Sequence, residues 1–321
     1  MLRWLLVFSL SVFLQSGVWA QTANQGRADS TVWGDPDLQG MWTNTTTTPL
    51  QRPSEYAGRE RLTEEERADL DERAAQNSDR PPPKGSTGAY NSFWVDRGVR
   101  TTQTSLVVEP ADGQLPALTE RVRERDATIA ASRNAAPDSF ENLNLYDRCI
   151  TRGLPGAMMP GFYNHNYQIL QTPDHVVILV EMIHDARIIP LDGRPHLDEN
   201  VGQWLGDSRG YWEGETLVVE TKVFSSKADE RASSGPLYLV LAAGEELHLV
   251  ERFTKIDADT IDYRFTVTDP TTYTSPWTAS MPMSRIEGPL FEYACHEGNY
   301  GLENILRGAR NAERLTDLSV Q

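Results

Sequence analysis

Positive charge is scarce in this chain. The 30 lysines and arginines are outnumbered by 46 aspartates and glutamates, which gives a formal net charge of −16. Proteins that bind nucleic acid or an anionic membrane surface present an excess of basic residues. The charge balance argues against both partners, and we expect a small-molecule ligand or substrate instead.

Long apolar runs are missing after the first twenty residues. Those twenty carry a positive start at Arg3, an apolar run from Leu5 to Leu14 and small residues before Gln21, a pattern typical of a secretory signal. The run is too short for a comfortable membrane span. We predict that residues 1–20 are a signal peptide, that the mature protein is periplasmic or secreted, and that it does not associate with a membrane after cleavage. An uncleaved anchor helix is the alternative.

Cysteine is nearly absent, with only Cys149 and Cys295 in the whole chain. An oxidising compartment favours joining such a pair, so we predict a Cys149–Cys295 disulfide bond, with two separate thiols as the alternative. A bond that closes so long a loop contributes about 4–5 kcal/mol in the chain-entropy model.

The chain divides by composition into four parts. After the signal, residues 21–60 read as an extended arm that docks through "WGDPDLQGMWTN". Residues 61–148 read as a helical, loop-rich wrapping region, with one helix starting at the capping box Thr63–Glu66 and another over 118–132. Residues 149–321 form the predicted β-rich core. The parts from about residue 61 onward make one integrated domain.

Alternating apolar residues dominate the last part. Segments 167–171, 175–184, 247–253 and 261–267 show the period of two that is typical of strands with one buried face. They predict a mainly β fold, either an antiparallel, lipocalin-like barrel or a sandwich. A C-terminal helix is expected over about 299–314.

Several catalytic motifs are missing: the nucleophile elbow, the phosphate-binding loop, the Rossmann glycines and HExxH. The remaining candidates lie in four polar clusters, at 163–167, 181–187, 192–196 and 295–300. His184 ends the apolar row of the predicted strand 175–184, so we expect it to point into the barrel or its mouth. A core histidine bonded to a carbonyl group is the alternative.

We assign roles within these clusters by residue type. The predicted catalytic residues are His184, His296, Tyr163 and Tyr167, and the predicted substrate-binding residues are Asn164, Asn166, Arg187 and Glu297. An ion pair with an acidic residue is the alternative for Arg187. Glu181 is expected on the opposite strand face, His196 is the weaker histidine, and His248 reads as an ordinary strand residue.

No cofactor is predicted. A metal centre built from His165, His184, His196, His296 and Glu297 is a less favoured alternative, because none of these residues has a diagnostic spacing.

Four segments carry a family resemblance: "YNHNYQILQ", "EMIHDARIIPLDGRPH", "GDSRGYWEGETLVVE" and "YACHEGNYGL". They resemble a family of exported bacterial proteins that are mostly described as uncharacterised. No activity is established for that family, so the resemblance implies no catalytic residue. The strand-rich half is also similar to lipocalin-like (calycin) barrels.

Two functions follow from these observations. The first is an exported enzyme, a lyase, hydrolase or isomerase, that uses acid–base catalysis on a small or acidic sugar-like substrate in a barrel pocket. The second is a non-catalytic binding protein for an apolar or aromatic small ligand.

Overall fold

The computed structural model describes residues 30–77, 93, 95–96, 98–133, 136–228 and 245–320. The predicted signal peptide and the first part of the predicted arm lie outside these residues. Within the described part of the chain, none of the helices combines the length and the apolar character that crossing a membrane requires.

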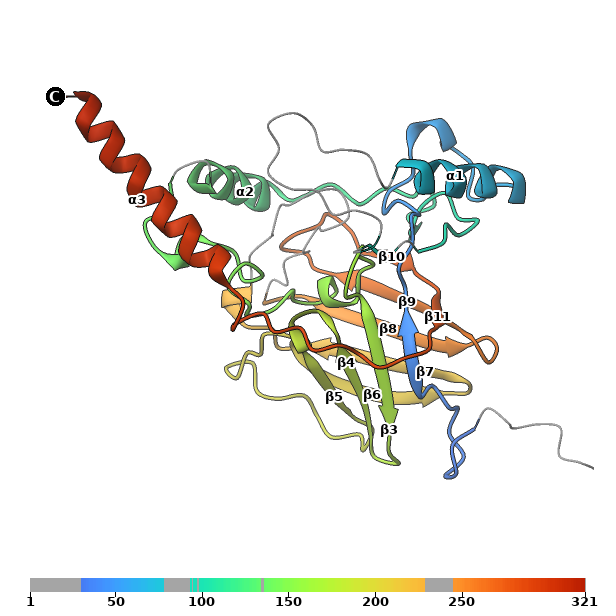
Figure 1. Cartoon of the computed structure of the whole chain (residues 1–321). Helices are drawn as coiled ribbons and strands as arrows, with labels where there is room; N and C mark the ends of the chain where they lie inside the picture. The colour runs from blue at the N-terminus through green and yellow to red at the C-terminus, as the bar shows by residue number, and fades with distance from the viewer. Residues whose placement is uncertain are drawn as a thin grey trace, which may run out of the picture.

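One sheet of eleven antiparallel strands organises the described residues (Figure 1). The strands are β1 (Gly40–Thr43), β2 (Val107–Glu109), β3 (Asn166–Gln171), β4 (His175–Val180), β5 (Ala186–Pro190), β6 (Asp207–Glu213), β7 (Thr216–Lys222), β8 (His248–Lys255), β9 (Thr260–Thr268), β10 (Trp277–Ser280) and β11 (Met283–Arg285). The α-helices are α1 (Glu64–Asn77), α2 (Glu120–Arg133) and α3 (Tyr300–Val320). The predicted capping box at the start of α1 is present, since the Thr63 and Glu66 side chains bond to each other's backbone N–H groups.

The sheet curls into a nearly closed barrel. Its strand order is β5-β4-β3-β1-β11-β9-β8-β7-β6, and the two outer strands, β5 and β6, pack against each other. Gly210 of β6 allows this approach, because a Cβ atom there would lie 2.7 Å from the Leu191 side chain and 2.9 Å from that of Ile189. The predicted mainly β fold with a barrel is confirmed.

Side chains fill the inside of the barrel. Along β9, Ile261, Tyr263, Phe265 and Val267 are buried and alternate with more exposed residues, as the period of two predicts. The ring of Tyr263 stacks on that of Phe253 in β8, with centroids 4.6 Å apart. This packing creates one continuous apolar core.

A strand from the predicted arm completes the barrel wall. β1 lies between β3 and β11, and its Trp42 is fully buried, with Nε1 donating to the Leu38 carbonyl at 2.9 Å. We expected this segment only to dock on the body. Four residues are too few to show a strand period, which is why the sequence did not indicate a strand here.

Strand direction places several polar segments at one rim of the barrel. The antiparallel ladders put the starts of β3, β5, β6 and β8 at the same rim as the ends of β4 and β7. Figure 1 shows α1 and α2 above the end from which β3 starts, and α3 extending away from the barrel.

Candidate functional site

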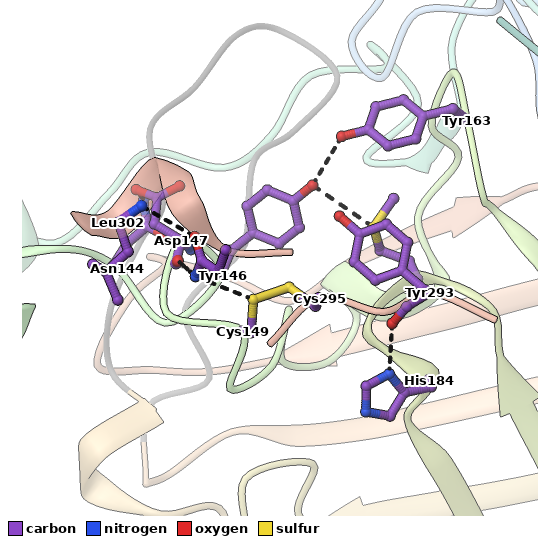
Figure 2. The surroundings of a disulfide bond; sticks show 11 residues. Asn144, Tyr146, Asp147, Cys149, Tyr163, His184, Tyr293, Cys295 and Leu302 are labelled. Atoms are coloured by element: carbon purple, nitrogen blue, oxygen red, sulfur yellow. Dashed lines mark hydrogen bonds between the residues drawn. A yellow bond between two sulfur atoms is a disulfide. The ribbon is translucent and has the colours of Figure 1, made fainter. Parts of the chain in front are cut away.

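The disulfide bond ties the predicted polar cluster at 295–300 to the segment around Cys149. Cys149 and Cys295 are bonded, with Cα atoms 5.8 Å apart, as predicted (Figure 2). A pocket of about 430 Å³ lies beside the bond and is lined by Asn164 from one cluster and by Tyr293 next to the other. The cluster at 163–167 therefore meets the segment that precedes α3.

Tyrosine hydroxyls gather beside this bond. The Tyr146 hydroxyl lies 3.1 Å from that of Tyr163 and 3.7 Å from the sulfur of Met182, as Figure 2 shows. Burial raises the pKa of both tyrosines, so both phenols are neutral at physiological pH. The Arg152 guanidinium lies 5.3 Å from the Tyr146 ring centroid. These groups can donate hydrogen bonds to a ligand but are poor proton acceptors.

His184 lies near the rim of the barrel and not inside it. β4 ends at Val180, and the following turn contains Ile183 and His184 with φ angles of 62° and 50°. The positive φ angles end the strand period, and His184 is exposed rather than inside the barrel. Its Nδ1 lies 3.0 Å from the Tyr293 carbonyl oxygen and donates to it (Figure 2). His184 thus ties this turn to the segment before α3.

Asp185 follows His184 in the chain, and the pKa of its carboxyl departs from the usual value. Burial raises the pKa of its carboxyl from 3.8 to about 6, although the Thr151 hydroxyl donates to it at 3.2 Å. Asp185 belongs to the predicted cluster 181–187, but its burial could not be predicted, because it arises from packing of the turn on the segment around Thr151.

Two predicted site residues hold structural positions at the rim. Tyr167 is fully buried, and its hydroxyl donates to Asn44 Oδ1 at 3.3 Å, so a solute in the surrounding water cannot reach it in this structure. Asn166 Nδ2 donates to Glu181 Oε2 at 2.7 Å, and the other oxygen of that carboxylate accepts the Phe291 N–H at 3.1 Å. Glu181 is therefore a buried carboxylate with hydrogen-bond donors at both oxygens.

Arg187 lies in the barrel core. Its guanidinium makes a two-point contact with the Glu251 carboxylate, with Nη1 2.9 Å from Oε1, and Tyr263 donates to the same Oε1 at 2.8 Å. The side chains of Arg187 and Glu251 are 1% and 0% exposed. The predicted contact between Arg187 and a substrate anion does not fit this position, and the ion-pair alternative does.

His296 and Glu297 are exposed on the chain between the disulfide and α3. His165 is buried, with Nδ1 donating to the Met159 carbonyl at 2.8 Å and Nε2 accepting from Arg152 at 2.6 Å. Burial and Arg152 lower the pKa of His165 to about 3. Among the residues described, no three His, Cys, Asp or Glu side chains are arranged to hold a metal ion.

A histidine and an aspartate form a close pair at the start of β6. His196 Nδ1 lies 2.9 Å from Asp207 Oδ2 and donates to it. The same oxygen accepts the Leu197 N–H at 3.0 Å, while Arg209 Nη1 donates to Oδ1 at 2.7 Å. Asp207 thereby fixes the orientation and tautomer of the imidazole, which leaves Nε2 as the proton acceptor.

A second histidine lines the same pocket. His196, His248 and Lys222 all contribute to a pocket of about 550 Å³ at the rim. His248 Nε2 lies 3.7 Å from Glu220 Oε2, which is beyond hydrogen-bond distance. Burial and the neighbouring Lys222 lower the pKa of His248, so its ring is neutral at neutral pH.

This pocket was not among the sites that we predicted. His196 and Asp207 are eleven positions apart, a separation that matches no motif, and they meet because the loop after β5 folds back onto the start of β6. His248 stands opposite the end of β7 only through strand register, since Thr221 pairs with Leu249. We named both histidines from the sequence but ranked them low, because no local pattern shows that they share a pocket.

No protein-family model, curated protein or solved structure matches the chain.

Proposed function

We propose that the chain is an exported enzyme that uses general acid–base catalysis on a small polar substrate. Its active site is the pocket lined by His196 and His248. The observation that carries the proposal is an aspartate-oriented imidazole on the wall of a pocket that also holds a second imidazole. The Cys149–Cys295 bond supports export, because disulfides persist in oxidising compartments.

His196 takes the role of the general base. With Nδ1–H donated to Asp207, the lone pair on Nε2 accepts a proton from the substrate or from a water molecule. Arg209 holds Asp207 in place, so little reorganisation is needed when the ring becomes charged.

His248 complements this base. A positive charge on His196 further disfavours protonation of His248, so the two rings accommodate one proton more readily than two. His248 therefore stays neutral when His196 is protonated, and it serves as a second hydrogen-bonding group for the substrate.

Lys222 suggests the kind of substrate. Among the described residues of the pocket wall, Lys222 carries the ammonium group. This group can stabilise a carboxylate or a developing oxyanion. Glu199, Glu245 and Glu246 also line the pocket and can accept hydrogen bonds from hydroxyl groups. With three glutamates against one lysine in the described lining, these groups suit a small hydroxylated substrate such as a sugar. The reaction class is then elimination, isomerisation or hydrolysis.

The alternative function is a carrier that holds its ligand inside the barrel. The packing of side chains inside the barrel does not support it. Trp42, Tyr167, Phe253 and Tyr263 are fully buried within the barrel, and the Arg187–Glu251 pair occupies the space between its strands. We therefore place the substrate at the rim rather than inside.

A substrate screen tests this proposal. The purified protein is assayed on uronic-acid oligosaccharides, esters and lactones, and any active substrate is repeated with His196→Gln and His248→Gln. Loss of a general base or acid costs 10²–10⁴-fold in rate, so we expect turnover to fall by at least about 100-fold in His196→Gln. His175→Gln, at the start of β4 on the opposite rim, is the matched control. Unchanged turnover in His196→Gln and His248→Gln would refute the site.

A further inference from the structure

A different pocket lies where the N-terminal region meets the barrel. Its volume is about 470 Å³, within the range of about 300–1,000 Å³ typical of small-molecule sites. Three walls enclose it: residues 45–47 after β1, the C-terminal end of α1, and residues 95, 96, 98 and 99 together with 160–162. None of the histidines discussed above belongs to it.

Hydrogen bonds between the walls hold this pocket open. The Thr46 hydroxyl donates to the Val99 carbonyl at 2.8 Å, and the Asp96 N–H donates to the Phe162 carbonyl at 2.7 Å. Phe162 is held further by an edge contact with the Tyr163 ring, with centroids 4.7 Å apart. A pocket fixed in this way needs little ordering when a ligand enters, which favours binding.

The lining is apolar apart from a few groups. Its apolar surface comes from Ala74, Ala75, Val95, Val99, Pro160 and Phe162. Two carboxylates, Asp71 and Asp96, also line it, and the described lining contains no lysine, arginine or histidine. An anionic ligand would meet these carboxylates, of which only Asp71 has a basic partner among the described contacts, whereas an uncharged ring system would gain from the apolar walls.

The two carboxylates differ in what already bonds to them. Asp71 accepts the Arg100 N–H and an Arg67 guanidinium N–H, each at 2.9 Å. Asp96 is exposed, accepts a backbone N–H from Asn164 and is close enough to Glu181 to interact electrostatically. A carboxyl group has about four lone-pair positions, so Asp96 retains acceptor capacity for one donor group on a ligand.

We propose that this pocket binds an uncharged aromatic small molecule that carries one N–H or O–H group, with that group directed at Asp96. The inference goes beyond the acid–base function, because the site shares no lining residue with the histidine pocket. Two ligand classes then bind at two sites: aromatic ligands in the pocket beside α1, and polar substrates in the histidine pocket.

Two dyes with the same ring system test the proposal. N-phenyl-1-naphthylamine is uncharged and carries an N–H group, while 1-anilinonaphthalene-8-sulfonate adds a sulfonate. Fluorescence titration of the full chain should show saturable binding of the uncharged dye and at least tenfold weaker binding of the sulfonate. Equal affinity for the two dyes, or no saturable binding of the uncharged dye, would overturn the proposal.

Variants locate the dye. Ala74→Leu adds bulk to the α1 wall and should weaken binding of the uncharged dye at least tenfold, while Ala312→Leu adds an exposed leucine on α3 and should change nothing. Val99→Asp adds a negative charge to another wall and should act like Ala74→Leu, which guards against a folding defect in one variant. Circular dichroism checks both folds. Wild-type dye affinity in folded Ala74→Leu and Val99→Asp would contradict this site. His196→Gln should lose turnover but keep dye binding, so the two proposals fail separately.

Discussion

The buried ion pair between Arg187 and Glu251 allows a stability prediction with a definite size. Arg187→Met leaves a carboxylate that is 0% exposed, with the Tyr263 hydroxyl as its remaining donor among the contacts described above. Removing one partner of a buried pair costs about 3–5 kcal/mol, because the other charge stays buried without compensation. That loss is a large share of a typical unfolding free energy of about 5–15 kcal/mol.

Removing both charges should cost much less. In the double variant Arg187→Met with Glu251→Leu, no charge remains, and the Tyr263 hydroxyl loses its acceptor at a cost of about 1–3 kcal/mol. Adding Tyr263→Phe removes that unsatisfied group as well. We therefore expect the triple variant to be more stable than Arg187→Met alone.

Urea unfolding followed by circular dichroism, with the disulfide intact, measures these differences. The dependence of the unfolding free energy on urea should not change between variants, so midpoints report stability. The reasoning is wrong if Arg187→Met costs less than about 1 kcal/mol, well below the range for buried pairs, or if the double variant loses the sum of the two single losses.

Three further predictions follow from the same contacts. Replacing Cys149 and Cys295 by serine should lower the unfolding free energy by up to about 5 kcal/mol in urea unfolding, because the bond closes a loop with a sequence separation of 146. Asp185→Asn should stabilise the fold by about 2–3 kcal/mol above pH 6 and have no effect below about pH 4. The sign follows because the pKa of Asp185 rises from 3.8 to about 6 on folding, so the folded state binds the proton more tightly and ionisation destabilises it. A pH series of urea unfolding checks this, and equal effects at pH 4 and pH 7 would contradict it. The His248 ring should titrate below 6.5 by NMR, and Lys222→Gln should raise its midpoint, since Lys222 contributes to lowering the pKa.

Local periodicity predicted most of the sheet. The alternation of Ile261, Tyr263, Phe265 and Val267 is written in consecutive residues, and each position obeys the period of two in the structure. The disulfide was predictable because the chain offers one pair of cysteines. In both cases the information is local or unique.

The site could not be predicted in the same way. In the sequence the apolar row of β4 extends to Met182 and His184, but in the structure the strand ends at Val180 and the following turn includes Ile183 at a positive φ angle. Likewise, the His196–Asp207 contact depends on how a loop folds back onto β6. Backbone reversals and loop packing leave no periodic signal, so the strand pattern pointed to His184, whereas the site that we propose is built on His196.

The most direct test of the proposed site compares two variants, His196→Gln and His184→Gln. Their turnover is measured on the first substrate that the wild-type protein converts. The account predicts at least about 100-fold lower turnover in His196→Gln and near wild-type turnover in His184→Gln, because His184 Nδ1 is bonded to a backbone carbonyl on the exposed surface. Wild-type turnover in His196→Gln together with lost turnover in His184→Gln would contradict the proposed site. The active site would then lie near His184 and the Cys149–Cys295 bond.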